Sequence, residues 1–361
     1  MTGFNRQEAF SGTKDVVQAL AFDASRLEEY LTKNIPGFQG PLTVKQFKGG
    51  QSNPTYMLET PSRKYVLRRK PPGKLLPSAH AVDREYKVMA ALGAQRFPVP
   101  KALLYSEDDS IVGTAFYVMS FEEGRIFWEL HMPDSNPAER AAIWDAQNAT
   151  IAQLHSLEPD KIGLSDYGKG EDYVARQVAR WSKQYVASKT EEIPEMENLM
   201  RWLPEHLPKQ QAVRVVHGDY RLDNMIIHPT KNEVMAVIDW ELSTLGDPLA
   251  DFTYHMMGWY MPSAKSGTGT GSLKDRDLKA LGIPSAEDYA ALYAKRTGFD
   301  PRGRDIDVYM AYNFFRIAGI LQGILGRVRD GTAANANAST MSRQVQPLAA
   351  AAWHFAERAG A

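Results

Sequence analysis

The chain of 361 residues contains no cysteine. This absence excludes disulfide bridges, thiolate metal sites and a thiol nucleophile, and it suits the reducing conditions of the cytoplasm, where we expect the protein to be. Residues 1–20 carry acidic side chains and have no continuous apolar stretch, so no signal peptide is expected. No apolar run approaches the roughly 18 residues that a membrane-spanning helix needs, so no membrane association is expected.

An excess of charge of either sign is also missing. The chain has 42 Lys and Arg against 43 Asp and Glu, a net charge of −1. No region combines dense positive charge with interleaved aromatic side chains, so nucleic acid is not an expected partner. The patterns G-x-x-x-x-G-K-[ST], G-x-S-x-G and H-E-x-x-H do not occur, and a Walker-type nucleotide site is therefore not expected.

The segment 213–251 carries the polar residues that suggest chemistry. An apolar run ends in H-G-D at Asp219, and Asn224 follows five residues later. Residues 225–227 and 234–238 predict two short strands joined by a polar turn, which is the pattern of a hairpin. Asn224 precedes the first strand and Asp239 follows the second, so their side chains can converge on one point.

These three residues fit phosphoryl transfer. Such a reaction needs a carboxylate near the acceptor hydroxyl, and Asp219 is placed to act there as a base or an orienting group. It also needs oxygen ligands for Mg²⁺ on the nucleotide phosphates, which Asn224 and Asp239 would provide. The alternative is a chance hairpin with two exposed carboxylates.

The pattern H-G-D-x-x-x-x-N followed by I-D-W resembles the catalytic and metal-binding segments of the aminoglycoside phosphotransferase family. These are small-molecule kinases with a protein-kinase-like fold. The resemblance implies an α+β, two-lobed fold. Residues 1–121 would form a small antiparallel-sheet lobe with one key helix. Residues 122–361 would form a larger, mainly helical lobe with the catalytic and metal-binding loops and the acceptor site, and ATP would bind between the lobes.

The segment L-G-D-P-L-A-D at 245–251 also resembles that family. Asp247 before Pro248 is typical of a helix N-cap, with proline in the first helical position, and we interpret Asp247 as structural. For Asp251 a structural role and a role at the catalytic loop stay open.

The first half of the chain predicts a helix over 23–34, with Ser25 and Glu28 as a capping box, and strands over 42–47 and 55–59. The turn between the strands stands where a kinase has its glycine-rich loop, although it is not GxGxxG. The resemblance implies that it covers the ATP phosphates, and the alternative is an ordinary hairpin turn. The turn residues concerned are Gly49, Gly50, Ser52 and Asn53.

Arg68 ends the next predicted strand, at the position where protein kinases have their phosphate-binding lysine. Glu85 lies on a predicted helix over 80–92, and the resemblance implies that it pairs with Arg68. The alternative is an exposed helical Glu85. We expect Arg69 and Lys70 to be solvated.

Strands are predicted over 102–106 and 115–121, and the second runs into the segment where kinases join their lobes. By position, the backbone of Ser120, Phe121 and Glu122 would hold adenine. Beyond residue 122 the pattern is mainly helical, with helices expected at 138–157, 173–185, 196–203 (stopped by Pro204), 252–260, 285–297, 307–328 and 341–358. We interpret His155 as structural, and Trp259 and Tyr260 as core residues rather than pocket residues.

The resulting hypothesis is an ATP- and Mg²⁺-dependent kinase that phosphorylates an alcohol group of a small molecule. The alternative is a nucleotide-binding module without catalysis, suggested by the missing GxGxxG and by Arg68 in place of lysine. Aminoglycosides are polycations, whereas residues 251–361 hold 10 acidic and 13 basic side chains. The motifs G-G-Q-S-N-P-T-Y and H-G-D-Y-R-L-D-N look closest to the branch associated with acyl-CoA dehydrogenases. That resemblance implies a hydroxyacyl or hydroxyacyl-CoA acceptor and a functional link to such an enzyme, with an aminoglycoside or other small molecule as the alternative acceptor. The sequence predicts no oligomeric state.

Overall fold

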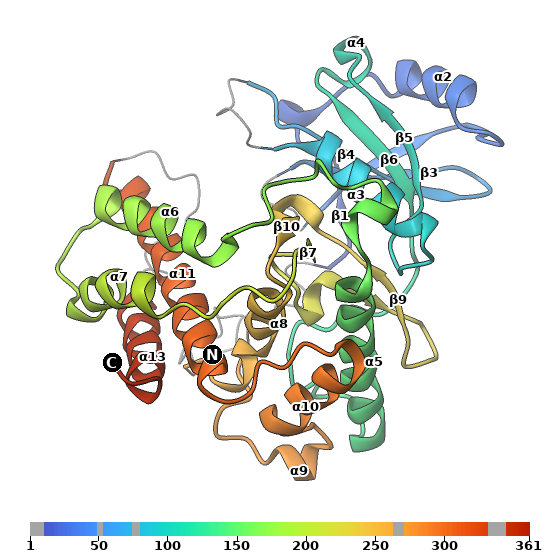
Figure 1. The fold of residues 1–361 in the computed structure, drawn as a ribbon. Coiled ribbons are helices and arrows are strands. Elements are labelled where there is room, and N and C mark those ends of the chain that lie inside the picture. The colour runs from blue at the N-terminus through green and yellow to red at the C-terminus, as the bar shows by residue number, and fades with distance from the viewer. Residues whose placement is uncertain (1–10, 49–52, 74–79, 263–270, 331–343) are drawn as a thin grey trace, which may run out of the picture. The chain divides into compact units, whose positions relative to one another are not determined.

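The computed structural model describes residues 11–48, 53–73, 80–262, 271–330 and 344–361 (Figure 1). The chain divides into two compact units. Unit 1 comprises residues 1–126, 162–167 and 224–243, and unit 2 comprises residues 127–161, 168–223 and 244–361. Unit 1 holds the antiparallel sheet and unit 2 is mainly helical, so the expected α+β class is confirmed. The boundary between lobes at residues 121 and 122 stays a prediction.

Unit 1 is built on a six-stranded antiparallel sheet with the order β1-β2-β3-β4-β6-β5. Its strands are β1 (Thr13–Lys14), β2 (Thr43–Phe47), β3 (Thr55–Glu59), β4 (Lys64–Arg69), β5 (Ala102–Ser106) and β6 (Phe116–Ser120). The register sets Arg68 of β4 opposite Thr55 of β3 and Tyr117 of β6. Because side chains alternate along a strand, Arg68 and Tyr117 share one face while Leu67 and Val118 share the other.

A helix covers each face of this sheet. Helix α2 (Ala24–Asn34) closes an apolar core with Leu67 and Val118, and α3 (Val82–Ala94) packs against β5 and β6. Two shorter elements complete this part of unit 1, the 3₁₀ turn η1 (Gln18–Leu20) and α4 (Asp109–Val112). Glu85 on α3 is therefore brought to the face that carries Arg68.

The predicted capping box of α2 is wrong. Asp23 is the N-cap, and its Oδ1 accepts hydrogen bonds from the backbone N–H groups of Ser25 (2.9 Å) and Arg26 (3.2 Å). Glu28 accepts instead from the N–H of Leu42, at 2.8 Å, and so ties the helix to the start of β2. Aspartate caps a helix as well as serine does, and Asp23 stands two residues earlier.

The expectation that Arg69 is solvated is also wrong, because its side chain is buried. Its Nη2 donates to the carbonyl of Leu20 at 2.8 Å, and its Nη1 donates to the carbonyl of Val112. The guanidinium also lies over the rings of Phe22 and Tyr56. A central strand covered on both faces buries consecutive side chains, so a run of basic residues there is not a solvated face. Lys70, the next residue, is half-buried.

The hairpin predicted after Asn224 is confirmed as β8 (Met225–Ile227) and β9 (Val234–Val237), which pair antiparallel in unit 1. Arg125 forms a β-bridge with Ile227 at the edge of this hairpin. Its N–H donates to the carbonyl of Ile227 at 2.7 Å, and its carbonyl accepts from the N–H of Ile227 at 2.8 Å. A Cβ on the neighbouring Gly124 would lie 2.5 Å from the carbonyl oxygen of Ile227, so this approach requires glycine. The 3₁₀ turns η3 (Leu222–Asn224) and η4 (Trp240–Leu242) flank the hairpin.

Unit 2 places a small two-stranded sheet among helices. The strands are β7 (Arg214–Val216) and β10 (Thr244–Gly246), which pair antiparallel. The other elements are α5 (Pro137–Ser156), η2 (Pro159–Ile162), α6 (Tyr173–Ser188), α7 (Pro194–His206), α8 (Pro248–Met256), η5 (Met257–Trp259), α9 (Leu278–Leu281), α10 (Ala286–Thr297), α11 (Arg304–Arg329) and α13 (Val345–Arg358). Helix α11 packs against both α6 and α13.

Several expected helix ends differ from the structure by a few residues, and two of them have a clear local cause. Pro204 does not stop α7, which continues to His206. Proline removes only one N–H donor, in the last turn of this helix, where the backbone can end irregularly. Helix α8 begins at Pro248, as the N-cap signal of Asp247 indicated and four residues before the start at Phe252 that the apolar pattern indicated. In the part of the chain that the structure describes, no helix combines the length and the apolar character needed to cross a membrane.

Candidate active site

A buried arginine gathers three carboxylates in unit 1. Nη2 of Arg68 lies 2.9 Å from Oδ1 of Asp239 and 2.9 Å from Oε2 of Glu241, and its Nε lies 3.3 Å from Oε2 of Glu85. The ion pair expected between Arg68 and Glu85 is therefore present. Burial opposes the charge of Arg68, but the carboxylates outweigh burial and raise its pKa. Strand β4 thus supplies a permanent, fixed positive charge beside the hairpin.

Glu85 is the centre of a buried hydrogen-bond network. Besides Arg68, it accepts from Nδ2 of Asn53 at 2.9 Å and from the hydroxyl of Tyr117 at 3.0 Å. Burial raises the pKa of Glu85 to about 7, although Arg68 and the Tyr117 hydrogen bond oppose the rise. Oδ1 of Asn53 also contacts Nδ1 of His80 at 2.8 Å.

This network decides what the side chain of Asn53 does. Its amide is fully buried and is engaged by Glu85 and His80, so it links the residues just before β3 to α3 and the residue that precedes it. His80, to which no sequence pattern pointed, precedes α3 and has a positive φ of 59°. The other predicted turn residues, Gly49, Gly50 and Ser52, lie outside the described residues.

Asn224 and Asp239 stand at the two ends of the β8–β9 hairpin. The N–H of Ile238 donates to the carbonyl of Asn224 at 2.9 Å and locks these ends together. Asp239 has φ 68°, in the left-handed region, directly after β9. Its side chain is 34% exposed, whereas Asn224 is 8% exposed. The left-handed turn costs conformational energy in a non-glycine residue, as often occurs at functional sites.

The oxygen donors at the hairpin fit Mg²⁺. One amide and one carboxylate are hard ligands, and this cation commonly keeps waters and substrate oxygens as its other ligands. Among the described residues, no group of three or more His, Cys, Asp and Glu side chains could hold a metal ion. The residues therefore suit an ion shared with a bound phosphate rather than one enclosed by protein alone.

Glu241 is a site residue that sequence reasoning did not assign. It lies two positions after Asp239, in the 3₁₀ turn η4, and shares Nη2 of Arg68 with it. Trp240, between them, is buried and its Nε1 donates to the carbonyl of Val237 at 2.9 Å. Alternation in D-W-E, with two acids flanking a large apolar residue, was the available signal.

Asp219 in unit 2 is held by two side chains. The hydroxyl of Tyr254, on α8, donates to Oδ1 of Asp219 at 2.6 Å, and Nε of Arg221 lies 3.1 Å from the same oxygen. Burial and the Asp219 charge raise the pKa of Tyr254, so the phenol stays protonated and remains a donor. The Asp219 side chain is 20% exposed, which leaves it accessible to a small molecule.

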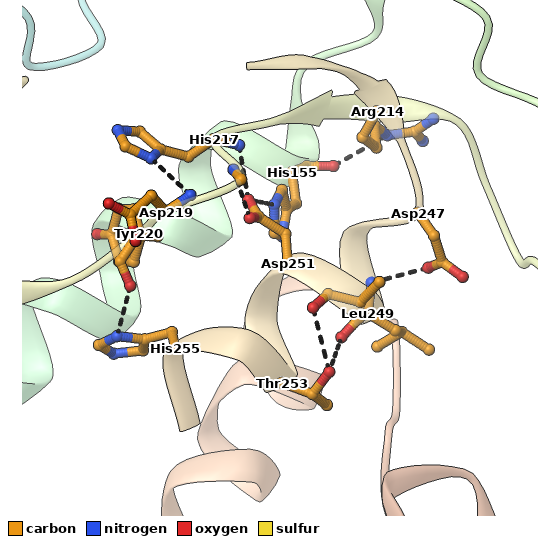
Figure 2. Close-up of polar contacts among 12 residues, drawn as sticks. His155, Arg214, His217, Asp219, Tyr220, Asp247, Leu249, Asp251, Thr253 and His255 are labelled. Atoms are coloured by element: carbon orange, nitrogen blue, oxygen red, sulfur yellow. Dashed lines mark hydrogen bonds and ion pairs between the residues drawn. The ribbon is translucent and has the colours of Figure 1, made fainter. Parts of the chain in front are cut away.

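Side chains of α8 and α11 form hydrogen bonds that hold the backbone leading to Asp219. Asp251 accepts from the N–H group of His217 at 2.7 Å, as Figure 2 shows. It also accepts from the N–H group of Gly218 at 2.8 Å. Nη2 of Arg316 donates to the carbonyl of Gly218 at 2.8 Å, and the same guanidinium lies 5.1 Å from the ring of Tyr254. Gly218 has φ 83°, which favours glycine.

Asp251, for which two roles were open, therefore anchors the backbone of His217 and Gly218, which precede Asp219. Burial alone would raise its pKa, but the hydrogen bond and charge of His155 lower it overall. His155 lies 3.2 Å from Oδ2 of Asp251 and 2.8 Å from the hydroxyl of Tyr293, both buried contacts, which fits the predicted structural role. Asp247 is the N-cap of α8, as predicted, and accepts from Leu249 N–H at 2.9 Å (Figure 2).

The three residues predicted to hold adenine lie at and after the end of β6. Ser120 donates its N–H to the carbonyl of Lys101 at 3.0 Å, so this donor is used by the sheet. Its hydroxyl accepts from the N–H of Lys101 and donates to the carboxylate of Glu122. The ring of Phe121 lies 5.7 Å from Nζ of Lys64. Adenine binding here stays a prediction. It rests on the backbone of Phe121 and Glu122 more than on that of Ser120, whose N–H is already used.

Two predictions about aromatic residues have different outcomes. Trp259 is buried and its ring lies 4.7 Å from that of Trp144 and 4.9 Å from that of Tyr289, as expected for a core residue. Tyr260 is only half-buried, and it lines a cavity that Trp259 also lines.

Residues 43–293 match the model of the phosphotransferase enzyme family (APH). Acyl-CoA dehydrogenase family member 10 of Mus musculus is 44% identical over 362 residues, covering 100% of this chain and 34% of that protein. Family member 11 of Rattus norvegicus is 44% identical over 345 residues, covering 93% of this chain and 44% of that protein. The chain thus spans between a third and a half of the length of these curated relatives.

Solved structures share the fold. A crystal structure from Ralstonia eutropha JMP134, assigned to the aminoglycoside phosphotransferases, is 47% identical with a TM-score of 0.85, covering 94% of this chain and 99% of that one. Choline kinase of Cryptosporidium parvum Iowa II is 13% identical with a TM-score of 0.62, covering 93% and 95%. An aminoglycoside phosphotransferase in complex with ADP and hygromycin B is 16% identical with a TM-score of 0.58, covering 92% and 98%. The chain therefore belongs to the phosphotransferase enzyme family and has its kinase-like fold.

Proposed function

We propose that this chain is an ATP-dependent phosphotransferase that moves the γ-phosphoryl group to a hydroxyl of a small molecule. The observation that carries the proposal is the hairpin pair Asn224 and Asp239, locked together beside the buried cation Arg68. A nucleotide triphosphate needs both features, because its charge must be neutralised and its phosphates positioned. The ADP in the distant aminoglycoside phosphotransferase complex supports nucleotide use.

In this proposal Arg68 attracts phosphate oxygens, and Glu85 keeps its guanidinium in place. A magnesium ion bound by Asn224 and Asp239 would supply positive charge to the phosphates. Backbone N–H groups of Gly49, Gly50 and Ser52 would cover the phosphates. Adenine binds to the backbone after β6, at Phe121 and Glu122.

Asp219 acts on the acceptor. Its carboxylate orients the acceptor hydroxyl and accepts its proton as the oxygen forms a bond to the γ-phosphorus. The bond between that phosphorus and the β–γ bridging oxygen breaks, and ADP leaves with the electron pair. Tyr254 and Arg221 both contact Oδ1, so they hold the carboxylate in one orientation while the reaction proceeds.

The acceptor in this proposal is an anionic hydroxyacyl compound, such as a hydroxyacyl-CoA. Two observations support it over the cationic acceptors named for the distant neighbours, aminoglycosides and choline. The relatives with 44% identity carry the name acyl-CoA dehydrogenase. Residues 251–361 also have a small excess of basic over acidic side chains, with 13 against 10.

Release of ADP against a panel of acceptors tests this function. We expect turnover with hydroxyacyl-CoAs, none with matched acyl-CoAs that lack the hydroxyl, and none without Mg²⁺. Efficient phosphorylation of kanamycin-like compounds, with hydroxyacyl-CoAs inert, would refute the acyl acceptor. Nucleotide binding without turnover on any acceptor would favour a non-catalytic binding module.

The variant Asp219→Ala tests the role of the carboxylate. We expect turnover to fall at least about 1,000-fold, because a positioned base and an orienting contact are lost together. ATP affinity should stay within about threefold, since nucleotide binding in this proposal uses other residues. Asp166→Ala, an exposed aspartate in unit 1, is the control. Turnover at the parent rate in Asp219→Ala would show that another group does this work.

A further inference from the structure

A cavity of about 390 Å³ opens in unit 2 along helix α13. Its floor contains Trp259 and Phe355, which are 6% and 4% exposed, and its rim carries the exposed basic residues Lys274, His354 and Arg358. The size falls within the range of small-molecule sites, about 300–1,000 Å³. None of the proposed phosphoryl-transfer residues lines it.

The walls of the cavity are held by contacts within the protein. Nε1 of Trp259 donates to the carbonyl of Pro284 at 3.0 Å, so the only donor of the indole is already satisfied. The ring of Tyr260 meets that of Phe355 edge-on at 5.1 Å. On the other wall, the N–H of Leu273 donates to the carbonyl of Gly258 at 2.8 Å and fixes the backbone next to Lys274. The site is therefore preformed, which lowers the entropic cost of binding.

The side chains of helix α13 that line the cavity change in character along the helix axis. Pro347, Ala350, Ala351, His354 and Arg358 line it at helical spacing, and so they share one face of the helix. The small apolar residues come first, and the basic residues His354 and Arg358 come last, on either side of Phe355. The distance along the axis from residue 347 to residue 358 is about 16 Å, because each residue adds about 1.5 Å. This arrangement suits an extended ligand with an apolar body and a polar end.

The charge at that end is positive. Among the described residues that line the cavity three are basic and none is acidic, although the whole chain has a net charge of −1. Arg358 pairs with Asp307 at 3.1 Å, outside the lining, while it also stacks on Phe355. Lys274 adds a second cation to the rim, and His354 adds an imidazole. A ligand whose polar end is negative is therefore favoured over a neutral or cationic one.

We propose that this cavity binds an unbranched, medium-length alkyl chain that ends in a carboxylate, of the kind represented by octanoate. The alkyl chain lies over Trp259 and Phe355 beside the alanines of α13, and the carboxylate lies among the basic residues of the rim. The proposal goes beyond phosphoryl transfer, because binding here needs neither nucleotide nor turnover.

Isothermal titration calorimetry of the full chain, without nucleotide, tests the ligand class. The probes are octanoate, 1-octanol and octylammonium, which share the chain and differ in charge. We expect octanoate to bind about tenfold more tightly than octanol, the effect of one charge-assisted contact, and octylammonium not to bind measurably. Equal affinity for octanoate and octanol would overturn the proposal, as would binding of octylammonium alone.

Variants test the location. Ala351→Phe should fill the cavity and weaken octanoate binding at least about tenfold, and Lys274→Gln should weaken it about threefold to fivefold. The controls are Gln346→Phe on an exposed part of α13 and Lys279→Gln on α9, which should bind octanoate as the parent does. Ala350→Phe replaces Ala351→Phe if thermal unfolding shows that the latter is not folded. If folded cavity-filling variants retain parent affinity, octanoate does not bind in this cavity.

Discussion

A single phenol connects helix α8 to the proposed catalytic carboxylate. Tyr254 has its hydroxyl 2.6 Å from Asp219, and its ring rests on the buried guanidinium of Arg316, which in turn holds the carbonyl of Gly218. Asp219 is thus oriented through its side chain and through the peptide before it. Neither Tyr254 nor Arg316 could be found by motif, because both lie more than thirty residues away in the chain and only the fold brings them to Asp219.

The variant Tyr254→Phe removes only the hydroxyl. We expect kcat to fall about tenfold while the KM for ATP stays unchanged, because a hydrogen bond to a charged group is worth about 1.5–3 kcal/mol and acts on the acceptor side. Steady-state kinetics with the best acceptor measures this. Tyr185→Phe, a buried tyrosine of α6, is the matched control. A kcat within twofold of the parent would show that Asp219 needs no help from the phenol.

Arg68→Lys tests whether the site needs the planar, multi-donor guanidinium of arginine or only a positive charge. Arginine reaches Glu85, Asp239 and Glu241 together, whereas a lysine ammonium is a single point charge and leaves at least one buried carboxylate poorly paired. We expect a loss of about 1–3 kcal/mol of unfolding free energy and an ATP affinity lower by about tenfold. Urea unfolding and nucleotide titration measure the two effects, with the exposed Arg63→Lys as control. Parent values for both would mean that charge alone suffices.

Helix α8 holds the loop that contains His217, Gly218 and Asp219. Its N-cap is Asp247, its first turn carries Asp251 and its next turn carries Tyr254, so one short helix supplies both the backbone clamp and the carboxylate contact. Strands β3 and β5 were predicted with the bounds observed, and the β8–β9 hairpin was predicted within one residue, because alternation and turn residues are local signals.

Other features could not be placed from apolar patterns alone. The apolar pattern alone placed the start of α8 at Phe252, whereas the cap signal of Asp247 and Pro248 marked the start that is observed. Arg69 looked solvated because burial of β4 on both faces depends on α2, α4 and η1, which lie elsewhere in the chain. The proposed site followed the same division: Asn224 and Asp239 were placed by the hairpin, whereas Glu241, His80 and Tyr254 depend on tertiary contacts.

Asp247→Ala tests the cap. The side chain accepts from Leu249 N–H and, through Oδ2, from the hydroxyl of Tyr309 at 2.7 Å. We expect a loss of about 2–3 kcal/mol of unfolding free energy, from the lost cap and the phenol left without its acceptor. Asp277→Ala removes the exposed N-cap of α9 and should cost about 1 kcal/mol or less. If the two variants lose equal stability in urea unfolding, the burial of Asp247 adds nothing.

Acid should destabilise the molecule partly through His255. Burial lowers its pKa to about 4, from 6.5, although the contact with the Tyr220 carbonyl and the Asp251 charge oppose the shift. Since the unfolded chain takes up this proton first, the stabilisation is complete above pH 6.5 and is lost as pH falls toward 4. The full effect is about 3 kcal/mol.

The variant His255→Gln isolates this contribution from that of the other titrating groups. The unfolding free energy of the parent, measured between pH 7 and pH 4, should fall by about 3 kcal/mol more than that of the variant. Equal slopes for parent and variant would mean that His255 stays protonated or is freely solvated in the folded protein.

The chain passes from one compact unit to the other five times. The path crosses from one to the other after residues 126, 161, 167, 223 and 243. One crossing falls within the five residues that separate Asp219 from Asn224. A boundary at residue 121 captures the sheet but leaves the β8–β9 hairpin behind, because that hairpin belongs to the compact unit of the sheet and returns from far along the sequence.

These repeated crossings restrict how the protein can be divided into fragments. A fragment ending near residue 126 would carry Arg68 and Glu85 without the oxygen donors that accompany them, and a fragment starting there would carry those donors without the sheet that seats them. No single cut at one of these five crossings leaves both compact units whole, so the chain does not divide into two exchangeable halves.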